Sequence, residues 1–368
     1  MLKEQRIDWD PATGVVNTPP QQVFLELTTR CNLACLHCSK DYGLPEAGNK
    51  QELDPAIIER LMPWLERARF VNLNVVGEPM LARSFGDVTR RLAQAGVDVS
   101  FNTNGLLLSE KRAENLVRDG VQSVAVSFDG TSFNMPLRGV GWETVRDGLV
   151  NLDEAKRRLG SDLPHLALAY TLMRSNLSEL VPLLDDVLPR VRLHAVHIQP
   201  LVVFYETLRG ENIYEATAVD ECVERARALC TSHGTELVLF RSQFSQDERS
   251  ADLTEQIREL GPFSPELGCT DPFHEIKVRA DGSLDACSFG RRVDVNLAER
   301  DLGEIWNGPW YRQLRLALAA GRYEGICAKC PCIHGGAMNQ LTPLRPGVHH
   351  SKAARLSDVA GPSTARER

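Results

Sequence analysis

The stretch Cys31-Asn32-Leu33-Ala34-Cys35-Leu36-His37-Cys38 places three cysteines at the spacing C-x3-C-x2-C. It follows an apolar segment, residues 23–27, that is typical of a β-strand. Three thiolates can hold three irons of a [4Fe–4S] cube, which leaves the last iron open to a small molecule. Zinc is less favoured because it takes four ligands, and His37, the nearest further donor, lies between two of the cysteines. A disulfide would leave an odd cysteine.

The composition of the 368-residue chain is that of a globular protein with one large and one smaller domain. It is 43% hydrophobic and 25% charged. A net charge of −7 without a long basic run disfavours a nucleic-acid partner. Neither a membrane-spanning apolar stretch nor a signal peptide is present. We therefore expect no membrane partner and a cytoplasmic location, where the ten cysteines stay reduced unless they bind metal.

A repeating strand–helix pattern begins near residue 21. The expected strands are residues 23–27, 71–76, 97–102, 121–128, 165–173 and 194–201. The expected helices are residues 54–68, 84–95, 109–119, 142–159, 176–188 and 219–233. The strands are almost continuously apolar, as in sheets that are buried on both faces. The alternation predicts a parallel sheet, and the pattern alone fits a doubly wound sheet and a barrel equally well.

A second set of cysteines, Cys269, Cys287, Cys327 and Cys330, follows this pattern. Residues 273–279 and 283–287 are expected to form a β-hairpin, and residues 302–319 a single amphipathic helix. Four thiolates around these elements can saturate an iron–sulfur cluster or a zinc ion, and geometry alone permits both.

The other three cysteines differ from this set. Cys332 could replace one of these ligands, stay free or take part in chemistry. Cys222 and Cys230 lie on an apolar helix face and are expected to be core thiols.

As an ordered set, the motifs resemble the radical SAM superfamily with a C-terminal twitch module, the shortened form of the SPASM domain. The motifs are the three-Cys loop, Gly77-Glu78-Pro79, Ser127-Phe128-Asp129-Gly130, a C-x12-G-x4-C hairpin from Cys269 to Cys287, and Cys327-x2-Cys330. The resemblance implies an α/β fold: a partial (β/α)6 TIM-type barrel with a small twitch module. The expected domains are an N-terminal extension (1–20), the barrel (21–234), a linker with the auxiliary module (235–341) and a disordered tail (342–368).

The resemblance also implies the cofactors and their ligands. Cys31, Cys35 and Cys38 would hold a [4Fe–4S] cluster that binds S-adenosyl-L-methionine (SAM). The four C-terminal cysteines would hold one auxiliary [4Fe–4S] cluster. Further SAM contacts are expected from Gly77, Glu78 and Pro79 (amino group), from Ser127 and Asp129 (ribose and carboxylate), and from Arg138 (carboxylate). Weaker candidates are Asn102 and Asn104 after the third strand, and Gln199 and Leu201 near the adenine.

The implied reaction is reductive cleavage of SAM to a 5′-deoxyadenosyl radical, which abstracts a hydrogen atom from a substrate. We expect a small sugar or aminocyclitol, as in antibiotic pathways, oxidised at a carbinol C–H with the auxiliary cluster as electron acceptor. A reductase, flavodoxin or ferredoxin would supply the first electron.

Three alternatives are carried with this expectation. An epimerase needs a thiol as hydrogen donor. No non-cluster cysteine lies on a loop that follows any of strands two to six, so only Cys332 could serve. A peptide- or protein-modifying maturase is less favoured, since only about 20 residues precede the first strand, too few for a fused leader-recognition domain. A non-catalytic iron–sulfur or zinc protein would form no 5′-deoxyadenosine.

Overall fold

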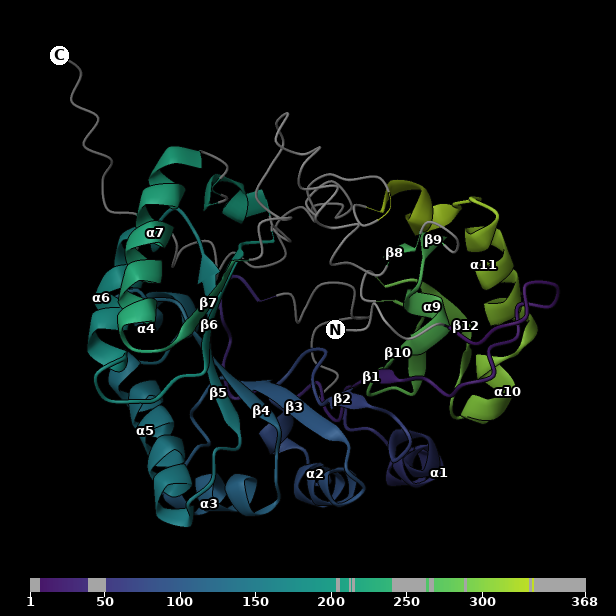
Figure 1. The fold of residues 1–368 in the computed structure, drawn as a ribbon, viewed down its shortest axis with the longest axis horizontal. Helices are drawn as coiled ribbons and strands as arrows, with labels where there is room; N and C mark the ends of the chain where they lie inside the picture. The colour runs from purple at the N-terminus through teal and green to yellow at the C-terminus, as the bar shows by residue number, and fades with distance from the viewer. Residues whose placement is uncertain are drawn as a thin grey trace.

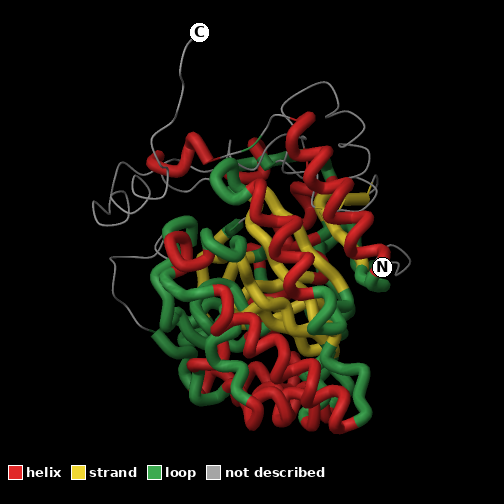
Figure 2. The backbone as a smooth tube through the Cα atoms, turned by 90° about the vertical axis from the view of Figure 1, so that its left-hand side faces the viewer, coloured by secondary structure: helices red, strands yellow, loops and turns green. Residues whose placement is uncertain are grey.

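The computed structural model describes residues 7–38, 51–202, 206–211, 213, 216–239, 263–264, 268–287, 290–330 and 333. Cys332 and the expected tail, residues 342–368, lie outside the described residues. The core of the described part is a curved sheet with helices on its outer side (Figure 1). Figure 2 shows the strands running together through the middle of the molecule.

Seven parallel strands, β1 to β7, follow one another across this sheet in chain order. They are Gln22–Leu25, Phe70–Asn72, Asp98–Thr103, Ser123–Phe128, His165–Leu172, Ala195–Pro200 and Glu236–Leu239. This confirms the α/β fold and the partial barrel. Strand β7 pairs with β6 and extends the sheet beyond residue 234, where we expect the barrel domain to end.

Helices connect these strands, as the sequence pattern predicts. They are α1 (Pro55–Leu65), α2 (Phe85–Gln94), α3 (Glu110–Arg118), α4 (Asn134–Arg138), α5 (Trp142–Leu159), α6 (Leu180–Val187) and α7 (Ala216–Ser232). Short 3-10 helices are η2 (Pro79–Leu81), η3 (Leu177–Glu179), η4 (Glu206–Glu211) and η6 (Gly325–Lys329). Side-chain caps mark the N-terminal ends of α1 and α3. The Asp54 side chain accepts a hydrogen bond from the Ala56 amide, and the Ser109 side chain accepts one from the Arg112 amide. Sequence reasoning did not predict α4, which lies directly after β4.

The C-terminal module continues the same sheet. Strand β10 (Glu275–Val278) pairs in parallel with β1, and β11 (Ser283–Asp285) and β12 (Arg292–Asn296) follow antiparallel. The expected hairpin is confirmed as β10 and β11. Residues 273 and 274, expected at the start of its first strand, belong instead to the short helix α9 (Asp271–His274). Strands β8 (Phe263–Ser264) and β9 (Gly268–Cys269) form a separate pair.

The prediction of a single helix over residues 302–319 is wrong. The structure has α10 (Leu302–Trp306) and α11 (Pro309–Ala319), separated at Asn307 and Gly308. Gly308 is extended, at φ −69° and ψ 169°, because the proline ring of Pro309 disfavours a helical conformation in the residue before it. Pro309 then begins α11, where its missing amide hydrogen breaks no helical bond.

The N-terminal segment, residues 7–20, packs against this module. Trp9 forms an isolated bridge with Val16 and contacts the Phe273 ring edge-on at 5.1 Å. The Asn307 side chain makes two hydrogen bonds of 3.0 Å with the Val16 backbone. Trp306 Nε1 donates to the Thr18 carbonyl at 2.9 Å. The segment and the module, far apart in sequence, therefore share one core.

Arg315 of α11 joins these parts. Its fully buried guanidinium donates to the carbonyls of Pro272 (2.8 Å) and Gly14 (3.2 Å). It also lies 4.4 Å from the centroid of the Trp306 ring. Burial lowers the pKa of Arg315 to about 10, so the guanidinium remains charged at neutral pH.

We expect Arg315→Met to lower the free energy of unfolding by about 2–4 kcal/mol, because it leaves buried carbonyls without a donor. Thermal unfolding followed by circular dichroism measures this loss. Gln313→Met, an exposed position on the same helix, is the matched control and should unfold like the wild type. Equal unfolding temperatures for the two variants would contradict the role given to Arg315.

Candidate active site

The three-Cys loop follows β1 and reaches the carboxyl ends of the parallel strands. Cys35 is buried, while Cys31 and Cys38 are partly exposed. The pKa of the Cys35 thiol is raised to about 11, mainly by burial; the nearby Arg138 opposes this rise, and the charges of Cys38, Asp129 and Cys31 add to it. The thiols are therefore close enough to influence one another.

The donor set fits a cluster. Thiols of this kind bind metal as thiolates, so binding would release the proton that burial now favours. The described residues contain no group of three or more His, Cys, Asp or Glu side chains placed as ligands of one ion. The fit therefore rests on the burial and mutual influence of the thiols.

The loop after β2 contacts the chain just before the cysteines. Gly77 has a φ of +78°, and a Cβ there would lie 2.4 Å from the Thr28 carbonyl oxygen and 2.9 Å from that of Arg30. The next amide, that of Glu78, donates to the Arg30 carbonyl at 2.7 Å. Only glycine permits both the positive φ and this approach. Gly77 therefore helps to set the position of the cysteine loop.

The carboxylate of Glu78 joins the ends of β2 and β3. It is buried and accepts from the Asn104 amide (2.9 Å), the Thr103 hydroxyl (3.0 Å) and the Met80 amide (3.2 Å). Burial raises its pKa to about 6, although these hydrogen bonds favour the charged form. The expected contact with the SAM amino group stays a prediction, as does that of Pro79, the buried first residue of η2.

Asn104 contacts the cysteine loop directly. Its Nδ2 donates to Asn32 Oδ1 at 2.7 Å and lies 3.9 Å from Cys31 Sγ. Hydrogen bonds to cluster sulfurs are one way a protein sets a cluster's potential. Asn102, two residues earlier, is exposed at the end of β3. Its backbone amide donates a hydrogen bond to Asn74 Oδ1.

Asp129, at the end of β4, forms a buried ionic clamp behind the loop. Its Oδ2 lies 2.6 Å from Arg138 Nε and 3.3 Å from His37 Nε2. The Asp129 side chain is 0% exposed and that of Arg138 is 9% exposed. Burial opposes the Arg138 charge, but Asp129 and then Cys35 outweigh it and raise its pKa. We name His37, Asp129 and Arg138 the clamp.

The clamp was not predicted, because sequence reasoning weighed His37 only as a zinc ligand. His37 and Asp129 are separated by most of three strand–helix units, so no local pattern links them. Asp129 and Arg138 were expected to contact SAM, and the structure pairs them with each other.

An apolar cluster anchors the loop on another side. The Leu36 amide donates to the Leu137 carbonyl at 2.9 Å. The cluster comprises Leu36, Leu137, Met173, Leu201 and Leu208, with Phe133 against it. Leu201, expected near the adenine, is 2% exposed within this cluster. Gln199 is exposed on β6, and Ser127 is partly buried on β4. Their SAM contacts stay predictions.

The second cysteine set gathers in the C-terminal module. Cys269, Cys287, Cys327 and Cys330 are all buried. Burial is the main cause that raises the pKa of the Cys269 thiol well above its usual range. The charges of Asp271, Cys287 and Cys330 act in the same direction. Four buried thiols that influence one another suit an iron–sulfur cluster.

These features define a class of protein. The chain belongs to the radical SAM superfamily: the profile of that superfamily matches residues 25–185, and that of the SPASM iron–sulfur cluster-binding domain matches residues 269–331. It is therefore a radical SAM enzyme with a SAM-binding [4Fe–4S] cluster and an auxiliary SPASM-type cluster. No helix among the described residues is long and apolar enough to span a membrane.

Curated relatives resemble the chain over most of its length. Mycofactocin maturase MftC from Mycobacterium ulcerans is 32% identical over 327 residues, covering 85% of this chain and 81% of that protein. The tungsten-containing aldehyde ferredoxin oxidoreductase cofactor-modifying protein from Pyrococcus furiosus is 23% identical, covering 84% and 86%. Fe-coproporphyrin III synthase from Methanosarcina barkeri is 25% identical, covering 77% and 73%.

Two solved structures share the fold. Streptococcus suis SuiB superposes with a TM-score of 0.61 at 14% identity, covering 82% of this chain and 68% of that one. The structure of anSMEcpe with bound AdoMet superposes with a TM-score of 0.57 at 15% identity, covering 94% of this chain and 97% of that one.

Proposed function

We propose that this protein is a radical SAM maturase that abstracts a hydrogen atom from a peptide substrate and leaves the peptide oxidised. The observation that supports a peptide is the 32% identity to the mycofactocin maturase over 85% of the chain. PqqA peptide cyclases also match part of the chain, at 26% identity over 45% of it. This proposal reverses the order of preference that the sequence motifs favoured.

In this proposal each of the two cysteine sets holds one iron–sulfur cluster. Cys31, Cys35 and Cys38 hold the SAM-binding cluster, and Cys269, Cys287, Cys327 and Cys330 the auxiliary one. Together with SAM, the clusters supply a deoxyadenosyl radical and a place for the electron taken from the substrate. A flavodoxin, a ferredoxin or their reductase provides the starting electron, in the reducing cytoplasm.

The remaining side chains position these groups. Glu78 and Asn104 fix the strand ends against the cysteine loop, and the clamp fixes the loop from behind. Asn102 and Gln199, exposed at the ends of β3 and β6, are the side chains we assign to SAM or substrate. We propose that the barrel domain ends after β7 rather than at residue 234.

Oxidation is favoured over epimerisation by the placement of the described non-cluster thiols. Cys230 is fully buried in the core, as expected, and Cys222 is partly buried and donates to the Leu177 carbonyl at 3.2 Å. Both lie on α7, outside the sheet. Neither is presented to a substrate at the strand ends as a hydrogen donor.

A second candidate is oxidation of a small non-peptide molecule, including the sugar or aminocyclitol carbinol expected from the motifs. It is supported by the relatives named for cofactor modification and for Fe-coproporphyrin III synthesis, which match 84% and 77% of the chain.

The test is anaerobic reconstitution, followed by incubation with SAM, dithionite and either short precursor peptides encoded near the gene or a panel of aminocyclitols and sugars. Mass spectrometry should show 5′-deoxyadenosine and a lighter, oxidised peptide. An oxidised sugar with unchanged peptides would establish the second candidate. A product of unchanged mass that carries solvent deuterium would indicate epimerisation. No 5′-deoxyadenosine, with both clusters verified, would overturn every catalytic assignment.

A further inference from the structure

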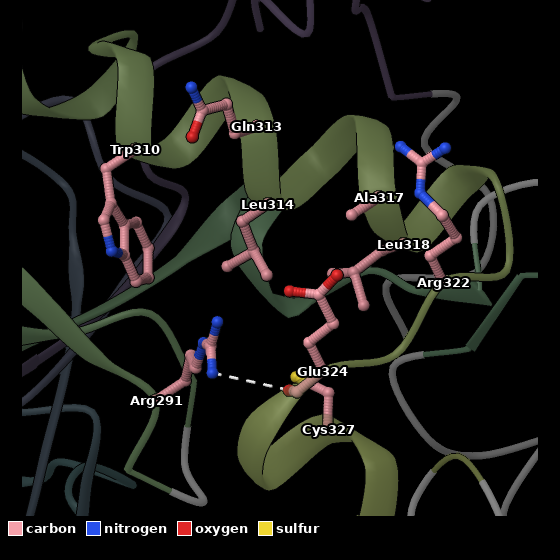
Figure 3. Close-up of a pocket in the computed structure, with 9 residues that line it drawn as sticks. All are labelled: Arg291, Trp310, Gln313, Leu314, Ala317, Leu318, Arg322, Glu324 and Cys327. Atoms are coloured by element: carbon pink, nitrogen blue, oxygen red, sulfur yellow. Dashed lines mark hydrogen bonds between the residues drawn. The ribbon is translucent and has the colours of Figure 1, made fainter.

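A polar pocket of about 140 Å³ lies beside Cys327, between α11 and η6 (Figure 3). Arg291, Trp310 and Arg322 line it with Glu324 and with Cys327 itself. The pocket thus places charged side chains next to a ligand of the auxiliary cluster. None of the motifs considered above includes these side chains.

Arg291 is held against the backbone turn that carries Cys327. Its Nη1 donates to the Glu324 carbonyl at 3.4 Å, and the Cys327 amide donates to the same carbonyl at 3.2 Å. The guanidinium lies 5.9 Å from the centroid of the Trp310 ring. Figure 3 shows it directed toward Glu324 and Cys327.

Gly325 leaves room for this arrangement. It has a φ of +59°, and a Cβ there would lie 2.5 Å from Arg291 Nη1. In addition, Arg291 Nε is buried and donates to no hydrogen-bond partner among the described residues. The guanidinium is therefore fixed in place by the fold of the turn, and its buried edge faces the protein.

We propose that Arg291 raises the reduction potential of the auxiliary cluster by holding a positive charge beside Cys327. The inference rests on the proposed role of Cys327 as a ligand, and it is independent of the substrate. Reduction adds one negative charge to a cluster, and a fixed nearby cation stabilises the reduced state.

The other two charges on the pocket provide internal comparisons. Glu324 is exposed and has the opposite sign, so its charge should lower the potential. Arg322 is also exposed, and solvent should screen its charge more strongly than that of Arg291. The three side chains should therefore differ in the sign and size of their effects.

The test is an EPR-monitored redox titration of full-length protein in which Cys31, Cys35 and Cys38 are alanines, so that only the auxiliary cluster contributes. In Arg291→Gln the equilibrium constant for one-electron reduction should fall about tenfold, which is about 59 mV in midpoint potential. Arg291→Lys should keep most of the wild-type potential, and Arg322→Gln should shift it less.

Glu324→Gln covers the case in which Arg291→Gln fails to retain its cluster. It leaves Arg291 and both backbone hydrogen bonds in place and should raise the potential. Iron and sulfide content verify the cluster in each variant. Unchanged potentials in both Arg291→Gln and Glu324→Gln would overturn the inference. Failure of the peptide assay would leave these potentials unaffected, so the two proposals can fail separately.

Discussion

Replacing Cys35 with alanine is expected to abolish formation of 5′-deoxyadenosine and to leave the auxiliary cluster in place. Cys35 is the buried member of the three-Cys loop, and two remaining thiolates would not retain a cluster with an open iron. After anaerobic reconstitution the variant should hold about half of the wild-type iron. Iron analysis and chromatographic detection of 5′-deoxyadenosine measure the two effects independently.

Cys222→Ala is the matched control, because Cys222 is a partly buried thiol outside both cysteine sets. It should retain the wild-type iron content and the wild-type rate of SAM cleavage. SAM cleavage by Cys35→Ala, or full iron content in that variant, would show that the three-Cys loop does not hold the SAM-binding cluster.

The parallel α/β sheet was predictable because each strand–helix unit carries its own local signals, whereas the choice of a partial barrel came from the family resemblance. Apolar runs of strand length alternate with capped amphipathic segments, and both patterns arise from short-range sterics and burial. The cysteine spacings carry information of the same local kind. These features therefore gave the fold class, the cofactors and the approximate element bounds.

Contacts between distant segments were not predictable in this way. Nothing local in Glu275–Val278 indicates that it pairs with β1, since a strand's neighbours depend on the whole topology. The break between α10 and α11 was an error of a different kind. Gly308 and Pro309 are visible in the sequence, and the amphipathic pattern was followed across them.

The SAM-site residues show the same limit. Sequence motifs placed Glu78 and Asp129 after the second and fourth strands, which is where they lie, whereas Arg138 is the last residue of the unpredicted helix α4. The motifs did not show that these side chains already pair with protein groups. A residue's place along a strand follows from local pattern, whereas its partners depend on which other elements the fold brings beside it.

The clamp gives the second large expected effect. Asp129→Asn removes the carboxylate that Arg138 and His37 share, and it leaves a buried guanidinium beside Cys35 without its counter-charge. Loss of one member of a buried ion pair costs about 3–5 kcal/mol. Groups that hold a metal ligand in position typically contribute about 10–100-fold to metal affinity or activity. We expect about a 100-fold slower SAM cleavage and incomplete occupancy of the SAM-binding cluster.

The same variant separates the clamp from the direct SAM contact that the motifs predict for Asp129. A clamp predicts lost iron at the three-Cys loop, whereas a direct contact predicts a full cluster with weaker SAM binding. His37→Asn is the graded comparison, because it keeps the 2.6 Å Asp129–Arg138 pair and should lose less iron. If Asp129→Asn keeps both clusters and only its affinity for SAM falls, the carboxylate acts on SAM, and the pairing with His37 is secondary.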